Sequence, residues 1–278
     1  MIFELKSVSY AYPEVTALQE VSLTIARGER VVVLGANGSG KSTLLRLLDG
    51  LDFPSSGTIS FDGRELSEPA LALDSFAFDF RRRVSLVFQN PDVQLFNPTV
   101  FDEIAFGPLQ MRWPKARILD QVHEAMARME IAHLKDRAPH RLSGGEKKRV
   151  ALASVLVLDP DVLLLDEPTA ALDPRSQSHI VDFLAGSGGS KTIITATHDL
   201  HIVEDIADRC IVLENGRVAA QGTVHEILGD EALIRRTHLL HSHRHRHESG
   251  IIHSHPHLHG YHSHQHVPPL TGESDHPA

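Results

Sequence analysis

The feature that most constrains the fold is a glycine-rich loop between a short apolar run and an apolar-faced helix. The segment that begins at Gly35 fits the pattern G-x-x-x-x-G-K-[ST] at every fixed position. It follows the β-branched run Val31–Leu34 and precedes a predicted helix over Lys41–Asp49. This order predicts an α/β fold with a phosphate site at the end of the strand. The predicted phosphate loop comprises Gly35, Ala36, Asn37, Gly38, Ser39, Gly40, Lys41, Ser42 and Thr43.

Polyphosphate chemistry explains these residue types. Glycines let the backbone adopt conformations that a Cβ would forbid, so that its N–H groups can face the phosphates. Lys41 would contact the β- and γ-phosphates, and the Ser42 hydroxyl would bind Mg²⁺. The alternative interpretation is a glycine-rich turn that binds no ligand. The predicted strand before the segment and the predicted helix after it favour the phosphate loop.

Two acidic residues follow a second apolar run. Val162–Leu165 reads as a buried central strand, and Asp166 and Glu167 come directly after it. Burying two adjacent carboxylates without a cation or protons is costly, which argues against a structural role. We therefore expect Asp166 to bind Mg²⁺ and Glu167 to act as the base for the attacking water.

Polar residues also end two further predicted strands. Gln89 follows the run Val84–Phe88, and His198 follows Ile193–Thr197. Taken singly, Gln89 suits a turn and His198 suits a helix cap. Ligands of open α/β sheets, however, bind beyond the carboxyl ends of the strands. The four strand ends together predict that Lys41, Gln89, Glu167 and His198 share one crevice.

Helical and strand patterns alternate along the second half of the chain. Such alternation predicts crossovers and a largely parallel sheet with helices on both faces. The helical spacing of Thr99–Arg137 is expected to break at Pro108 and Pro114. Further expectations are a helix over Leu200–Ala207 and two edge strands, Arg209–Leu213 and Arg217–Ala220, turning at Asn215-Gly216.

The string Leu142-Ser143-Gly144-Gly145-Glu146 supports a family assignment. Read alone, Ser143 and Glu146 form a capping box at the start of a helix. Its two glycines also expose backbone N–H groups and the positive helix end to an anion. Placed between the phosphate loop and the acidic strand, the string resembles the signature of ATP-binding-cassette ATPases.

The resemblance extends over residues 1–230, which look like the nucleotide-binding domain of that family. It implies an α/β P-loop NTPase (RecA-like) core with a mostly parallel sheet, an antiparallel β subdomain and an α-helical signature subdomain at about 92–150. It implies ATP and Mg as cofactors. It makes Lys41, Gln89, Glu167 and His198 catalytic and gives Mg²⁺ the ligands Ser42, Gln89 and Asp166.

Further roles follow only from the resemblance. Tyr12 looks like the aromatic residue that stacks on adenine, and Ala171–Asp173 resembles a loop that crosses a dimer interface. In the family, the residues Ser143, Gly144, Gly145 and Glu146 contact the nucleotide held by the opposite subunit. The chain is therefore expected to form a head-to-tail pair with a second copy of itself, and a homodimer is the simpler expectation.

A finer resemblance lies in Phe88–Phe96, which is similar to the segment in ATPases of energy-coupling-factor importers. Those importers take up vitamins, nickel or cobalt. The resemblance implies transmembrane transporter subunits and a substrate-binding membrane component as partners. It also implies a peripheral place on the cytoplasmic side of the cell membrane.

The C-terminal region has a different composition. Of the 20 histidines in the chain, 13 lie between His238 and His276, and residues 231–278 are expected to form a flexible tail. Alternating imidazoles suit Ni²⁺, Cu²⁺, Zn²⁺ and Co²⁺. A solvated low-complexity tail and a pH-responsive segment remain alternatives. The predicted transition-metal ligands are His243, His245, His247, His253, His255, His257, His259, His262, His264 and His266.

Composition narrows the function classes. A formal net charge of −9 argues against a nucleic-acid partner. The only cysteine, Cys210, excludes an internal disulfide and reads as a buried strand residue. No apolar run reaches the roughly 18 residues that span a bilayer. The leading hypothesis is thus an importer ATPase for nickel or cobalt, ahead of a vitamin importer ATPase, a metallocentre-assembly NTPase and a soluble cassette acting on DNA or ribosomes.

Overall fold

The computed structural model describes residues 1–187, 189, 191–239, 242–246 and 252–256. The chain divides into two units, Met1–Leu239 and Leu240–Ala278. The first unit is built on two sheets and contains every residue of the predicted nucleotide site.

A six-stranded sheet, in the order β10-β9-β3-β8-β7-β6, carries the predicted site. The five strands from β9 to β6 run parallel, whereas β10, at the edge beside β9, pairs antiparallel. The residues of β3, β6, β7 and β8 are almost all buried, as expected for strands covered on both faces. The strands are β3 (Arg30–Leu34), β6 (Val84–Val87), β7 (Val162–Asp166), β8 (Thr192–Thr197), β9 (Arg209–Glu214) and β10 (Arg217–Thr223).

The prediction of two edge strands after residue 208 is half wrong. β10 is at the edge, whereas β9 lies inside the sheet, between β10 and β3. The four residues Cys210–Leu213 are all buried. An uninterrupted apolar run of this kind is typical of a central strand, because both of its faces are covered.

A second sheet is antiparallel and has the order β2-β1-β4-β5. The turn between β4 and β5 uses Asp62 and Gly63, both at positive φ, and an Asp-Gly pair is typical of a two-residue hairpin turn. The strands are β1 (Phe3–Tyr12), β2 (Val15–Ile25), β4 (Ser56–Phe61) and β5 (Arg64–Glu65).

Helix α1 (Lys41–Leu48) joins the two sheets. Its residues Leu44, Leu45, Leu47 and Leu48 belong to one core cluster with residues of both sheets. The helix also lies against β2, β7 and β8. Because the last three residues of the phosphate loop form the start of α1, burial of this helix fixes the loop at the junction of the sheets.

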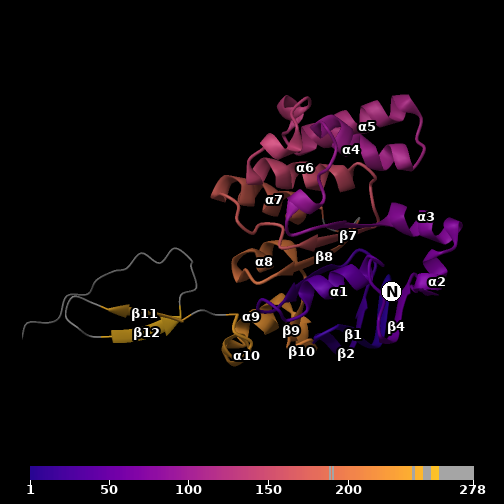
Figure 1. Cartoon of the computed structure of the whole chain (residues 1–278). Helices are drawn as coiled ribbons and strands as arrows, with labels where there is room; N and C mark the ends of the chain where they lie inside the picture. Colours follow the sequence, from indigo (N-terminus) through magenta and orange to yellow (C-terminus); the bar gives the residue numbers. More distant parts are fainter. Residues whose placement is uncertain (188, 190, 240–241, 247–251, 257–278) are drawn as a thin grey trace, which may run out of the picture. The chain divides into compact units, whose positions relative to one another are not determined.

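Three of the remaining helices of this unit form a separate group. In Figure 1, α4, α5 and α6 pack together at the top of the view, apart from the antiparallel strands at the bottom. The others are distributed around the sheets. The helices are α2 (Glu68–Leu71), α3 (Asp74–Arg83), α4 (Val100–Gln110), α5 (Lys115–Arg128), α6 (Gly144–Leu156), α7 (Pro174–Gly186), α8 (Val203–Ile206), α9 (Val224–Gly229) and α10 (Glu231–Arg236). The 3₁₀ helices are η1 (Pro91–Val93), η2 (Ala132–Leu134), η3 (Pro139–Arg141) and η4 (Leu200–Ile202).

Two helix predictions need correction. α4 continues through Pro108 instead of breaking there, whereas α5 begins after Pro114 as expected. Burial of Ile104, Ala105 and Pro108 in the α-helical group outweighs the proline cost of about 3 kcal/mol. The helix predicted over Leu200–Ala207 is instead η4 followed by the short α8.

The predicted domain boundary at residue 230 also needs correction. α10 is a helix within the first unit, with Leu233 and Ile234 buried, and the unit ends at Leu239. These apolar side chains make residues 231–239 part of the packed structure. The second unit contains β11 (Ser242–Arg246) and β12 (Ile252–Pro256), which pair antiparallel where the sequence predicted no regular structure.

Across the described ranges, no helix combines the length and apolar character needed to cross a membrane.

Candidate functional site

The phosphate loop has the backbone geometry that its glycines predict. Gly38 and Gly40 adopt φ values of 81° and 103°, which side chains rarely tolerate. A Cβ on Gly40 would also lie 2.6 Å from the backbone oxygen of Ala17, so the loop passes close to β2. Both restraints exclude larger residues at this position and hold the start of α1 in place.

Lys41 lies at the buried centre of the predicted crevice. Its Nζ donates hydrogen bonds to the backbone oxygens of Gly35 at 2.8 Å and Ala36 at 3.3 Å. The same atom lies 3.7 Å from Oε1 of Glu167. Burial lowers the pKa of Lys41, while the carboxylates of Glu167 and Asp166 act in the opposite direction. The ammonium is thus placed between the phosphate loop and the acidic strand end.

Glu167 connects three strand ends. It follows β7 with a left-handed φ of 45°, and its carboxylate is buried. Oε1 lies 2.8 Å from Nδ1 of His198, and Oε2 accepts a hydrogen bond of 3.0 Å from the Thr197 hydroxyl. The structure therefore brings Lys41, Glu167 and His198 together, as the sequence predicted.

Thr197 was not among the predicted site residues. It is fully buried at the end of β8, 30 residues from Glu167 in the sequence. A threonine in a buried strand is ordinary, since β-branched residues suit strands. Only the contact with Glu167 gives it a role in the site.

Asp166 has the surroundings of a cation ligand. Its pKa is raised by burial, and a hydrogen bond with the Ser42 side chain opposes that shift. Its Oδ1 is buried and has no hydrogen-bond partner. A buried carboxylate oxygen without a partner is costly unless a cation satisfies it. The pair of Asp166 and Ser42 therefore fits Mg²⁺, which prefers oxygen ligands.

Gln89 is attached to the site through its backbone. Its carbonyl oxygen accepts a hydrogen bond of 2.9 Å from Nζ of Lys148, a buried residue of α6. The ammonium of Lys148 in turn interacts with the charges of Asp166 and Glu167. Among the described residues, none forms a hydrogen bond with the Gln89 side chain. Lys148 is a second site residue that the sequence analysis missed, because a lysine in a charged helix segment reads as a surface residue.

Tyr12 lies beside the start of α1, at the edge of the site. Its hydroxyl is 3.5 Å from Oγ1 of Thr43, and 41% of the residue is exposed. An exposed aromatic ring next to a phosphate loop is available for stacking on a base.

Ser143–Glu146 lie at the start of α6. They form the capping box that the sequence predicts when this segment is read alone. The Ser143 side chain accepts from the Glu146 backbone, and the Glu146 carboxylate accepts from the Ser143 backbone N–H at 2.7 Å. Ser143 and Glu146 line a cavity of about 890 Å³ together with Asp173 and Ser176 of the α7 start. The phosphate loop contributes no residue to that cavity, so the two motifs face different spaces within one chain.

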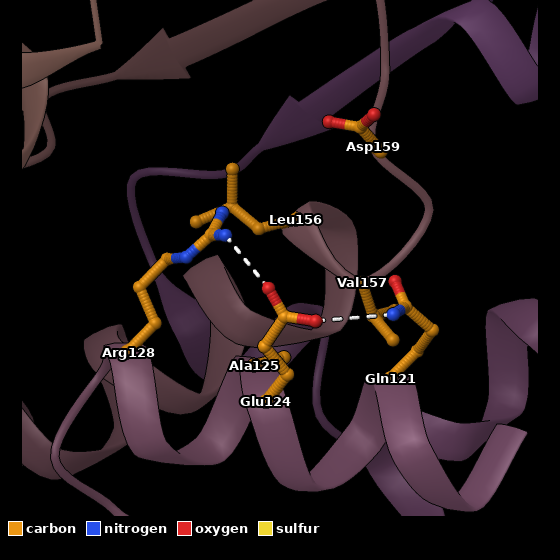
Figure 2. A pocket seen from close by; sticks show the side chains of 7 residues that line it. All are labelled: Gln121, Glu124, Ala125, Arg128, Leu156, Val157 and Asp159. Carbon is orange, nitrogen blue, oxygen red and sulfur yellow. Dashed lines mark hydrogen bonds and ion pairs between the residues drawn. The ribbon is translucent and has the colours of Figure 1, made fainter. Parts of the chain in front are cut away.

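A further cavity, of about 240 Å³, lies between α5 and the end of α6 (Figure 2). Glu124 accepts hydrogen bonds of 3.1 Å from Gln121 and from Arg128 there. Asp159, which also lines the cavity, pairs instead with Lys191, and none of the lining residues belongs to the predicted nucleotide site.

The predicted transition-metal ligands lie in the second unit. Backbone pairing of β11 with β12 places His243 opposite His255 and His245 opposite His253. The other predicted ligands lie outside the described residues: His247, His257, His259, His262, His264 and His266.

Comparisons with known sequences point to one family. The family model described as "ABC transporter" matches residues 18–170. The chain is 57% identical to the nickel import ATP-binding protein NikO of Rhodobacter capsulatus, over 86% of this chain and 95% of that protein.

Solved structures agree with this result. The cbiO1 protein of Clostridium perfringens, described as part of the ABC transporter complex cbiONQ, has 40% identity and a TM-score of 0.72, covering 86% of this chain and 94% of its own. The cassette MJ0796, solved as a dimer in a post-hydrolysis state with ADP and Pi, has 28% identity and a TM-score of 0.72, covering 80% and 98%.

Proposed function

Because the chain belongs to the ABC transporter family and is one of its ATPases, we propose that it powers uptake of a transition-metal cation, nickel or cobalt. It would do so as the ATP-binding subunit of an energy-coupling-factor importer. The observation that carries this proposal is the 57% identity with a nickel import ATPase over most of both chains. The histidine-rich region after residue 237 supports a metal rather than a vitamin as cargo.

The residues of the crevice divide the work of hydrolysis. The phosphate loop and Lys41 hold the triphosphate, and Tyr12 stacks on the base. Glu167 takes a proton from the attacking water, and His198 with Thr197 holds its carboxylate in position. Gln89 connects this site to the partner subunits.

Mg²⁺ would be held by Ser42 and Asp166, with Gln89 as the third predicted ligand. When bound, the ion neutralises charge that develops on the phosphates. The unpartnered Oδ1 of Asp166 is the observation that supports this assignment.

A second copy of the chain would complete each site. Ser143 and Glu146 line a space separate from the phosphate loop of their own chain, so the segment Ser143, Gly144, Gly145 and Glu146 is placed to contact the ATP of a partner. The dimer of MJ0796 supports this arrangement. The loop Ala171–Asp173, beside the same cavity, would lie at the dimer interface.

The surface next to the Gln89 loop supports docking of transmembrane subunits. Val93 and Phe96 are each 68% exposed, and Phe96 stacks edge-on against the partly exposed Phe106. Exposed apolar groups gathered in this way are typical of an interaction surface. The chain would thus sit peripherally on the cytoplasmic side of the membrane, beside a substrate-binding component.

The test is uptake of ⁶³Ni and ⁵⁷Co by cells that lack their own nickel and cobalt importers. The chain is produced together with its native membrane partners, and a Glu167→Gln variant serves as the inactive control. We expect uptake of one or both metals that the variant abolishes. Energised uptake of a labelled vitamin, with neither metal accumulated, would contradict the metal assignment and support the vitamin alternative.

A further inference from the structure

Lys148, a buried lysine of α6, joins this helix to the segment that contains Gln89. Lys148 of α6 is 2% exposed, and its Nζ donates to the backbone oxygens of Phe88 at 3.0 Å and Gln89 at 2.9 Å. These oxygens belong to the segment that leaves β6. The side chain therefore ties α6 to the loop at the carboxyl end of the sheet.

Polar and acidic groups surround the Lys148 ammonium. Burial lowers its pKa to about 8, and the charges of Asp166 and Glu167 act against that shift. Placing an ammonium in the interior is costly, and two carbonyl oxygens and two carboxylates offset the cost here. An apolar side chain would fill the same space without the free-energy cost of burying a charge.

Neighbouring contacts hold the same two segments together. The Gln94 side chain donates to the Ala151 oxygen at 3.0 Å and to the Ser154 hydroxyl at 3.1 Å, both on α6. Lys147 pairs with Asp92 of η1 at 2.7 Å. Segment 88–94 and α6 are thus joined at several points, and Lys148 also interacts with the acidic pair at the end of β7.

We propose that Lys148 is a positioning residue that couples the two ATP sites of the homodimer. Gln89 serves the ATP held by its own chain, whereas Ser143–Glu146, at the start of the same α6, contact the ATP of the partner. A shift of either motif changes the hydrogen bonds of Lys148, and so moves the other. The inference rests on the proposed dimeric ATPase and is independent of the cargo.

The test compares the ATP dependence of hydrolysis in the full chain with that of Lys148→Met, Lys148→Gln and Lys148→Arg. For two coupled sites we expect a wild-type Hill coefficient approaching about 2. The Met and Gln variants should lower it towards about 1, and the Arg variant should restore it. Lys191→Met is the matched control, because Lys191 also pairs with a carboxylate and a backbone oxygen, those of Asp159 and Pro160, outside the site.

The outcomes separate the two claims. An unchanged Hill coefficient in folded Lys148→Gln, or a wild-type Hill coefficient of about 1, overturns the coupling role. Failure of the proposed function is seen differently, as absent metal uptake by a complex that still hydrolyses ATP cooperatively. If Lys148→Met does not fold, the Gln and Arg variants still decide the question.

Discussion

At the scale of single residues, the site depends on a carboxylate that three groups hold. Glu167 contacts Thr197, His198 and Lys41, and these contacts orient its carboxylate. The sequence identified two of the three partners, because a histidine and a phosphate-loop lysine carry recognisable chemistry. It could not identify Thr197, since hydroxyl groups in buried strands are common.

Replacing Glu167 by Gln should slow ATP hydrolysis about 10²–10⁴-fold, because the base is lost. ATP binding should remain, since the amide keeps the shape of the side chain, and the bound ATP should trap a dimer. Steady-state hydrolysis and size-exclusion chromatography with ATP measure the two effects. Glu204→Gln, on the exposed side of α8, is the control. Turnover near the wild-type rate in Glu167→Gln would show that the base lies elsewhere.

The buried carboxyl group of Asp49 should make the stability of the folded chain depend on pH. Asp49, at the end of α1, is buried, and burial raises its pKa to about 7 although Arg81 lies 3.6 Å away. The folded chain therefore binds a proton that the unfolded chain has released between pH about 4 and about 7. Stability should fall across that window as pH rises, by up to about 4 kcal/mol.

The Asp49→Asn variant tests this expectation. A neutral amide has no proton to lose, so its free energy of unfolding should change less between pH 5 and pH 8. Urea unfolding of both proteins at the two pH values is the measurement. Parallel pH profiles for wild type and variant would rule out Asp49 as the source.

At the scale of elements, the close approach of two helix starts should be sensitive to one methyl group. A Cβ on Gly145 of α6 would lie 2.5 Å from Oγ of Ser176 on α7, whereas a Cβ on Gly144 would meet nothing within 4 Å. The Ser176 hydroxyl is itself bonded to Asp173, so it cannot move without breaking that hydrogen bond.

Gly145→Ala should therefore destabilise the chain by about 1–3 kcal/mol, as overpacking usually does. Gly144→Ala should leave stability unchanged or raise it slightly, because alanine favours helices. Thermal unfolding of the two variants gives a direct comparison. Equal midpoints would mean that α6 and α7 do not pack this closely.

The elements themselves were predicted unevenly. Apolar runs such as Val162–Leu165 gave strands at the expected places, because a buried run flanked by polar residues has few other uses. Pro108 misled the prediction, since the packing of α4 overrides a local penalty. The inner position of β9 was missed because the sequence does not state which strands become neighbours.

At the scale of the whole molecule, the boundary of the first unit predicts where the chain can be shortened. Removing residues 240–278 should leave ATP hydrolysis and the unfolding midpoint unchanged and should reduce metal binding. Removing residues 231–278 also deletes α10, and should destabilise the chain because Leu233 and Ile234 are buried. Isothermal titration with Ni²⁺ and thermal unfolding distinguish the two truncations. Loss of ATP hydrolysis on removal of residues 240–278 would show that hydrolysis requires the second unit.

The sequence by itself determined the phosphate loop, the acidic strand end and the α/β class. Each of these depends on residues that are adjacent in the chain, where local geometry and side-chain chemistry are enough. Tertiary structure alone decided the contact of Thr197 with Glu167, the hydrogen bonds of Lys148 to the backbone at Gln89 and the inclusion of α10 in the first unit. These features depend on contacts between distant segments, and such contacts form only when the sheets and helices bury their apolar faces together.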